Sequence, residues 1–320
     1  MRFSDQDGVD PLLSALADGA TRIFKRLKQD PDVFTTLGAN TSGDIQFELD
    51  VWADDVLREA LATVPSVGWV VSEELDALRK MGDGPWSVSL DPIDGSKSAA
   101  TGMPPGSIFG VFKNATAPHQ FCGANLCAAG FFIYGLQLEL FVADKAGIKR
   151  FVYDDGSGRW LEQSLPKSLP QGGYFCINAS NRGQWPMWLR AHYDRIMGAQ
   201  PPDNLRWYAS MVMDVKRLLL QGGVFAYPAD MREGYENGHL RLVYEAIPMA
   251  FLVHSLGGLS SDGTQSLLDI APDSLHQKSQ VFLGEREKIL ALETSRNADE
   301  GKDVLNGEKQ PEQEDHQMKP

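Results

Sequence analysis

Two carboxylates lie three residues apart where the chain leaves an apolar run. In the segment WSVSLDPIDGSKSAATGMPPGSIFGVF, residues 86–112, the runs WSVSL and SIFGVF are typical of buried strands, and Asp91 and Asp94 lie in the turn after the first run. A carboxylate at the end of a buried strand is costly unless it is paired or binds a cation. Asp91 and Asp94 are therefore the first candidate site residues.

Four more acidic residues lie at similar places. Glu73 and Glu74 end the apolar run VGWVVS, Asp44 lies in a polar loop, and Asp50 lies where a helix is expected to begin. Each has an ordinary explanation alone: Asp50 as an N-cap, Asp44 as a turn residue, Glu74 as a solvated loop charge. Brought together, these carboxylates would repel one another unless divalent cations neutralised them. Oxygen ligands without His or Cys partners favour a hard ion such as Mg²⁺ or Mn²⁺.

The sequence D-P-I-D-G-S suits such a site. Pro92 has a fixed φ and holds the preceding Asp91 extended, so that both carboxylates can face one point, where the Ile93 carbonyl offers another oxygen. Gly95 lets the backbone approach an anion closely, and the N–H groups of Gly95 and Ser96 can bind phosphate oxygens. Metal-binding carboxylates beside a phosphate-binding turn indicate a phosphoryl hydrolase.

Helices and strands are expected in both halves of the chain, which indicates an α/β protein. The patterns predict helices over residues 11–29, 51–64, 119–135, 186–197, 210–223 and 245–258. They predict strands over residues 67–74, 86–90, 107–112, 136–144, 148–155, 159–163, 174–180 and 222–229.

A Ser-, Pro- and Gly-rich segment, SLPKSLPQGG, is the best candidate for a linker between domains. The expected division is a metal- and phosphate-binding domain over 1–167 and a sugar phosphate-binding domain over 168–293. Residues 294–320 are almost wholly polar and are expected to form a disordered tail.

Composition excludes several classes of protein. The net charge is −13 and the body of the chain has no Lys/Arg block, so no nucleic-acid partner is expected. No apolar run approaches the roughly 18 residues that a membrane span needs, and the N-terminal residues do not resemble a secretory signal. Cys122, Cys127 and Cys176 are an odd number without C-x-x-C spacing, which favours reduced thiols in a cytoplasmic protein without a zinc site.

The chain resembles the class I fructose-1,6-bisphosphatases, within the wider superfamily of Mg²⁺-dependent sugar and inositol phosphatases. The D-P-x-D-G-S/T core alone indicates only the superfamily. The narrower resemblance lies in further segments, which follow the family's order across roughly residues 35–290: SGDIQFELDV, VSEE, GSIFGVF, SMVMDVKRLLLQGGVFAYPAD, LRLVYEAIPMAFLVHSLGG and LDIAPDSLHQKSQVFLG. The resemblance implies a layered α-β-α-β-α fold with two domains.

The resemblance also implies a reaction. The positions that match the family's metal ligands are Asp44, Glu73, Glu74, Asp91, Ile93 through its carbonyl, Asp94 and Glu245. Asp50 and Glu74 match a carboxylate pair that takes the proton of the attacking water. The implied activity is in-line hydrolysis of the 1-phosphate of fructose 1,6-bisphosphate, giving fructose 6-phosphate and phosphate, with Mg²⁺ as the cofactor and Mn²⁺ as an alternative.

Other positions match the family's contacts with the sugar and its second phosphate. With Gly95 and Ser96, the implied substrate-binding residues are Asn178, Arg206, Met211, Tyr227, His239 and Arg241. In the family the arginine at the position of Arg206 comes from a neighbouring subunit, so the resemblance implies a homotetramer or a homodimer.

Four positions depart from the family pattern. Trp207 and Asn181 stand where the family usually has Tyr, His239 where it has Lys, and Lys97 where it has a second Ser after D-G-S. Because neutral His is a weaker phosphate partner than Lys, the second pocket is expected to be altered. Two alternatives follow: a sedoheptulose-1,7-bisphosphatase or related sugar phosphatase, and a catalytically impaired regulatory member whose site Lys97 spoils.

Overall fold

The computed structural model describes residues 9–30, 34–39 and 45–307. The α-helices are α1 (Asp10–Gln29), α2 (Glu48–Ala62), α3 (Ser96–Ala99), α4 (Met187–Gly198), α5 (Met211–Gln221), α6 (Ile247–Ser255) and α7 (Arg286–Gly307). Short 3₁₀ turns are η1 (Pro118–Gln120), η2 (Gly123–Asn125), η3 (Ala179–Gln184) and η5 (Leu267–Asp269), and η4 (Leu242–Ala246) is a π-helical turn.

The strands of the first half are β1 (Thr36–Ala39), β2 (Ile45–Phe47), β3 (Val67–Ser72), β4 (Arg79–Lys80), β5 (Trp86–Asp94), β6 (Gly106–Lys113), β7 (Leu126–Tyr134), β8 (Leu138–Asp144), β9 (Gly147–Asp154) and β10 (Arg159–Gln163). Those of the second half are β11 (Tyr174–Cys176), β12 (Asn204–Leu205), β13 (Val224–Tyr227), β14 (Leu240–Arg241), β15 (Leu259–Ser261), β16 (Lys278–Ser279) and β17 (Val281–Gly284).

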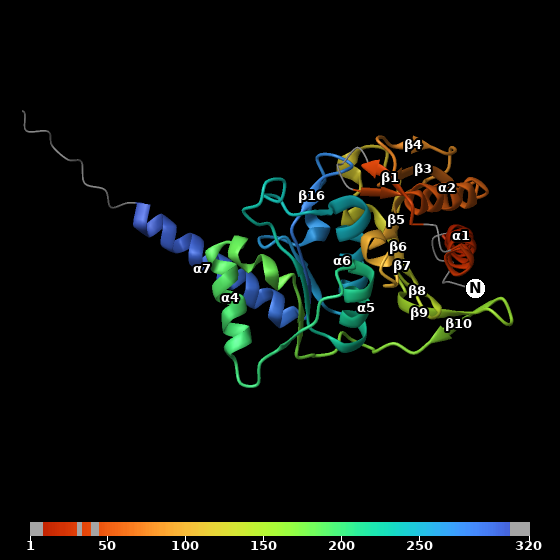
Figure 1. The fold of residues 1–320 in the computed structure, drawn as a ribbon. Coiled ribbons are helices and arrows are strands. Elements are labelled where there is room, and N and C mark those ends of the chain that lie inside the picture. Colours follow the sequence, from red (N-terminus) through yellow and green to blue (C-terminus); the bar gives the residue numbers. More distant parts are fainter. Residues whose placement is uncertain (1–8, 31–33, 40–44, 308–320) are drawn as a thin grey trace, which may run out of the picture.

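The architecture is a stack of helix and sheet layers, as the family resemblance implies (Figure 1). An eight-stranded sheet has the order β10-β9-β8-β7-β6-β5-β3-β4, and a five-stranded sheet has the order β12-β11-β13-β17-β15. Helices α1 and α2 pack on one face of the larger sheet, α5 and α6 fill the space between the sheets, and α4 and α7 cover the outer face of the smaller sheet. The fold is therefore a layered α/β fold with two domains.

The parallel pairing of β3 with β5 decides where the candidate acids lie. Ser72 pairs with Leu90, and the N–H of Glu73 donates to the Leu90 carbonyl at 3.1 Å. Both strands leave the sheet at the same edge, and β5 is buried along its whole length. The residues that follow β3 and those that end β5 are therefore neighbours in space.

The expected helix over 119–135 is wrong. The chain there makes η1 and η2 and then β7, which lies between β6 and β8 inside the larger sheet. Every residue of β7 is buried, so the strand shows a continuous apolar run without the alternation of a half-exposed strand. Such a run cannot be told from a buried helix by periodicity.

The C-terminal polar segment also differs from expectation. Helix α7 continues past residue 294 to Gly307, while residues 308–320 lie outside the described part of the chain. Ile289 and Leu292 of α7 are buried against the smaller sheet, and the Ser295 hydroxyl lies 3.0 Å from Nδ1 of His192 on α4. The first turns of α7 therefore pack on the smaller sheet and contact α4, and composition alone does not predict this helix.

The segment 164–173 contains neither helix nor strand and joins the two sheets. We propose that this segment contains the boundary between the two domains, between residues 167 and 168. No helix in the described part of the chain has the length and apolar character needed to cross a bilayer.

The core between the two sheets generates a stability prediction. The Phe131 ring is fully buried and stacks on Phe141 with ring centroids 4.9 Å apart. Phe131→Ala is expected to destabilise the protein by about 3–5 kcal/mol, because it removes buried area and leaves a cavity. The urea midpoint measures this, with Leu161→Ala on exposed β10 as a control that changes it little. Equal midpoints for Phe131→Ala and the unsubstituted protein would contradict this description of the core.

Candidate active site

A cavity of about 320 Å³ lies at the edge where β3 and β5 end. All the predicted acids that the structure describes line it: Asp50, Glu73, Glu74, Asp91, Asp94 and Glu245. Asp44, which was also predicted as a metal ligand, lies outside the described residues. The cavity therefore brings together every predicted acid that the structure describes.

Three of the acids come especially close. Asp91 and Asp94 end β5, and Glu245 projects from the π-helical turn η4 of the second half. One carboxylate oxygen from each lies within 4.8 Å of the others. The N–H of Ile93 donates to Oδ1 of Asp91 at 3.1 Å, and the N–H of Arg241 donates to Oε2 of Glu245. Backbone donors therefore fix the direction of two of these carboxylates.

Burial and mutual repulsion shape the electrostatics of this cluster. Loss of hydration raises the pKa of Asp91 well above its ordinary value, and the charges of Glu73 and Glu245 raise it further. Burial and the charge of Glu73 likewise raise the pKa of Glu245. Burial raises the pKa of Asp94 too, although hydrogen bonds oppose this. The cluster therefore favours a bound positive charge, since without one its members tend to hold protons.

Asp50 has a different place from the one expected. It is not the N-cap of α2 but its third residue, and its Oδ2 accepts the N–H of Phe47 at 2.8 Å. The expected N-cap was wrong because the helix begins three residues earlier than expected, at Glu48, directly after a strand. Oδ1 of Asp50 is buried without a hydrogen-bond partner among the described residues. Burial raises the pKa of Asp50 to about 7, with the charge of Glu74 contributing.

Helix α5 of the second half holds Asp94 in position. Oδ2 of Asp94 accepts the hydroxyl of Ser210 at 2.8 Å and the N–H of Val212 at 3.0 Å. Ser210 directly precedes α5. The sequence offers a signal for this residue, because a Ser before an apolar helical run is a usual N-cap, yet here its hydroxyl serves the acid instead.

The turn after Asp94 has the form expected of an anion-binding turn. Gly95 has φ of +81°, and a Cβ there would lie 3.1 Å from Oγ of Ser210. The short helix α3 begins at Ser96, so the N–H groups of its first turn have no carbonyl partner within the helix. Lys97 lines the same cavity, and its side chain is exposed. The turn can therefore present backbone donors to an anion next to the acids.

The opposite end of the cavity is built from rings. The ring of His239 lies between those of Tyr235 and Tyr227, with centroid distances of 4.8 and 5.8 Å. Trp207 lies 6.0 Å from Tyr227. Tyr235 carries no signal in the sequence, since it lies in a loop without periodicity, and sequence reasoning missed it.

The structure brings most of the predicted substrate-binding residues to this cavity, but it leaves one outside. The lining includes Gly95, Ser96, Asn178, Met211, Tyr227, His239 and Arg241, and the Ile93 backbone also reaches it. Arg206 does not line the cavity. It is exposed, and its Nη1 donates to the carbonyl of Leu205 at 2.9 Å.

The described residues fit a hard divalent cation. The donors are carboxylate and carbonyl oxygens, three carboxylates are crowded within reach of one ion, and the buried Oδ1 of Asp50 lacks a partner. A group that supplied positive charge here would offset both the repulsion and the desolvation of these acids.

Comparison with known proteins gives the same class of protein. The family sequence models "Fructose-1-6-bisphosphatase, N-terminal domain" and "Fructose-1-6-bisphosphatase, C-terminal domain" match residues 4–164 and 169–297. The chain therefore belongs to the fructose-1,6-bisphosphatase family.

Individual relatives agree over most of the chain. It is 40% identical over 312 residues to a class 1 fructose-1,6-bisphosphatase of Nitrobacter hamburgensis, covering 91% of this chain and 90% of that one. It is 37% identical over 286 residues to a class 1 fructose-1,6-bisphosphatase of Cereibacter sphaeroides, covering 87% and 86%. The holo form of Leishmania major fructose-1,6-bisphosphatase has a similar structure, with a TM-score of 0.86, 27% identity and coverage of 92% and 96%.

The raised pKa values generate a prediction about metal and pH. Because the pKa of the buried Asp50 carboxyl is about 7 in the fold, against an ordinary 3.8, the folded state binds its proton more tightly than the unfolded state does. The resulting stabilisation is lost progressively as the pH rises from about 3.8 to about 7. Without metal, the melting temperature is expected to fall between about pH 5 and pH 7. Added Mg²⁺ is expected to raise it more at the higher pH, since the ion and the protons compete for the same carboxylates.

Thermal melts with and without Mg²⁺ at both pH values measure the effect. Asp91→Asn is expected to remove most of the Mg²⁺ response, while Asp83→Asn, an exposed acid paired with Lys80, keeps it. A Mg²⁺ response that is absent, or that is larger at the lower pH, would contradict the metal site.

Proposed function

We propose that the chain hydrolyses the 1-phosphate of fructose 1,6-bisphosphate, giving fructose 6-phosphate and phosphate, in a Mg²⁺-dependent reaction. One observation supports the proposal: a single cavity is lined by the crowded carboxylates, by the turn at Gly95 and Ser96, and by the rings around His239. The names of the class 1 relatives support the substrate.

We assign the metal to the acidic end of the cavity. The residues that would hold it are Asp91, Asp94 and Glu245, together with Glu73, Glu74, the Ile93 carbonyl and Asp44. Mg²⁺ fits these oxygen donors, and Mn²⁺ is the alternative. When bound, such an ion supplies positive charge that stabilises the phosphoryl oxygens and makes a nearby water more acidic.

The residues of the chain contribute proton transfer and orientation. The unpartnered Oδ1 of Asp50 is a ready acceptor for the proton of the attacking water, and a pKa of about 7 suits a general base at neutral pH. Glu74 supports this role because its charge helps to raise that pKa. The N–H groups of Gly95 and Ser96 would hold the phosphate in line with the water, which lowers the entropy cost of the reaction.

The sugar would lie between the two ends of the cavity, against Met211 and Arg241. Arg241 is buried and its Nη1 donates to the His239 carbonyl at 2.9 Å, so its guanidinium is held in one orientation. Arg206 is exposed and does not line the cavity of its own chain. This supports the proposal that it binds the second phosphate in the cavity of a neighbouring subunit, in a homotetramer or homodimer. Lys97 is exposed, whereas Asp91 is 2% exposed, which argues against the impaired regulatory alternative: a solvated ammonium leaves the buried acids in place.

Sedoheptulose 1,7-bisphosphate is the second candidate substrate. The distal end of the cavity is lined by Trp207, Tyr235 and His239, so its shape differs from the Tyr and Lys pattern of the family. Sedoheptulose 1,7-bisphosphate, whose sugar is longer by one carbon, should therefore be assayed alongside fructose 1,6-bisphosphate.

Phosphate release by the purified protein tests the proposal. With Mg²⁺, fructose 1,6-bisphosphate is expected to yield phosphate, and EDTA to stop the reaction. Asp94→Ala is expected to lower kcat by at least about 1,000-fold, because several kcal/mol of transition-state stabilisation depend on the cluster. Asp83→Ala is the control and should leave kcat unchanged.

A substrate panel with sedoheptulose 1,7-bisphosphate and inositol 1-phosphate completes the test. Faster turnover of the seven-carbon bisphosphate would make it the preferred substrate. No phosphate release from any sugar bisphosphate would refute the assignment.

A further inference from the structure

One arginine that the reaction described above does not use lies in the loop that also carries Tyr235 and His239 of the cavity lining. Residues 228–239 join β13 to β14, and Arg232 is the only Lys or Arg among them. A small recess of about 10 Å³ is lined by Arg232, Asn181, Asn178 and Tyr227, and the last two also line the main cavity. Arg232 does not line the main cavity itself, but it adjoins the wall that Asn178 and Tyr227 form.

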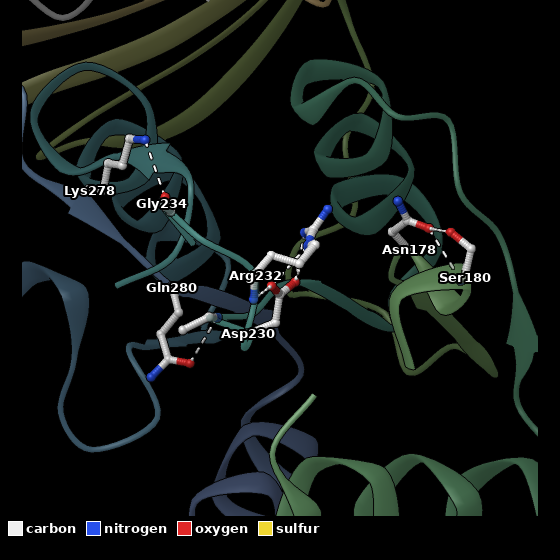
Figure 2. Close-up of polar contacts among 8 residues, drawn as sticks. Asn178, Ser180, Asp230, Arg232, Gly234, Lys278 and Gln280 are labelled. Atoms are coloured by element: carbon white, nitrogen blue, oxygen red, sulfur yellow. Dashed lines mark hydrogen bonds and ion pairs between the residues drawn. The ribbon is translucent and has the colours of Figure 1, made fainter. Parts of the chain in front are cut away.

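Asp230 fixes the orientation of this arginine. Nε of Arg232 donates to Oδ1 of Asp230 at 2.9 Å and Nη2 donates to Oδ2 at 2.7 Å (Figure 2). The side chain of Asp230 is 2% exposed and that of Arg232 is 33% exposed. The carboxylate thus lies behind the guanidinium, and the positive group faces outward.

A ring fixes the plane of the same guanidinium. Its central carbon lies 3.9 Å from the centroid of the Tyr235 ring. Stacking on a ring leaves the N–H edge of an arginine available for hydrogen bonds in its plane. Asp230 takes one edge, and among the described residues no hydrogen bond is recorded for Nη1 of Arg232. One edge of a pre-oriented arginine is thus available to a ligand.

Two other residues of the recess, Asn178 and Tyr227, can also donate hydrogen bonds. Oδ1 of Asn178 accepts the N–H of Ser180 at 3.3 Å and also its hydroxyl, which leaves the amide NH₂ of Asn178 to donate (Figure 2). The Tyr227 hydroxyl is close enough to Arg232 for the positive charge to act on its pKa, although burial raises that pKa to about 12. Such a hydroxyl stays protonated and can donate. Three donors, one of them charged, suit an anion.

We propose that Arg232 is a specificity-determining residue that binds the phosphate group that is not hydrolysed, together with the Asn178 amide and the Tyr227 hydroxyl. This assignment rests on the proposed function, which places a bisphosphate in the cavity with its scissile end at the acids. His239, which stands where the family usually has Lys, is stacked between two tyrosine rings. Arg232 supplies the fixed charge on this side from within the same chain.

Steady-state kinetics with two substrates test the assignment. With fructose 1,6-bisphosphate, Arg232→Gln is expected to raise KM by about 10- to 100-fold, the range for losing a hydrogen bond to a charged group, while kcat changes by less than about threefold. With fructose 1-phosphate, which lacks the second phosphate, KM should stay the same. Arg232→Lys keeps the positive charge but loses the two-pronged guanidinium. Its KM for fructose 1,6-bisphosphate is expected to lie between those of the unsubstituted protein and Arg232→Gln. Arg22→Gln is the matched control, because Arg22 is exposed, is paired with Glu59, and lines neither the cavity nor the recess.

Two further measurements keep the result decisive. Gln at position 232 leaves the buried Asp230 without its partner, so the double variant Asp230→Asn with Arg232→Gln is measured beside it. Calorimetric titration with fructose 6-phosphate in EDTA reports binding without catalysis, and both variants should bind about 10- to 100-fold more weakly than the unsubstituted protein.

The outcomes separate the two claims. An unchanged affinity for fructose 6-phosphate, or an equal rise in KM for both substrates, would overturn the role of Arg232. No phosphate release by the unsubstituted protein would refute the proposed function, and the titration would still decide whether Arg232 binds the sugar phosphate.

Discussion

The structure depends on holding several carboxylates of one sign together in a buried place. Oxygens of Asp91, Asp94 and Glu245 lie within 4.8 Å of one another, and Glu73 adds its charge to the same point. Repulsion and lost hydration both oppose this arrangement, and a bound divalent cation is the simplest source of compensation. The parallel β3 and β5, the turn η4 and the start of α5 all meet at this cluster.

The cluster also makes the two halves of the chain interdependent. Asp94 ends a strand of the larger sheet, but Ser210 and Val212 at the start of α5 hold its carboxylate. Glu245 comes from η4 and meets Asp91 across the interface. One apolar cluster contains residues of both sheets with α5 and α6 between them, so the packing that joins the halves also assembles the site.

Features that depend on local sequence pattern could be predicted from the sequence, whereas features that depend on tertiary contacts could not. The acids at the ends of β3 and β5 could be predicted to meet, because parallel strands leave a sheet at the same edge. Strand β7 could not, since a strand buried on both faces has no period. The continuation of α7 past residue 294 could not either, since its residues there are mostly polar and show no apolar period. The contacts of Ser210 and Arg232 also escape prediction, because loops and helix ends set them.

The most direct test of the account is a crystal structure of the protein soaked in Mn²⁺, with anomalous difference maps for the unsubstituted chain and for Asp91→Asn. The account predicts an anomalous peak bonded to oxygens of Asp91, Asp94 and Glu245 at about 2.0–2.6 Å, the range of hard-cation ligands. It also predicts that the peak is lost or much reduced in Asp91→Asn. Ordered carboxylates at this place without a Mn²⁺ peak, or an equal peak in the variant, would contradict the central claim.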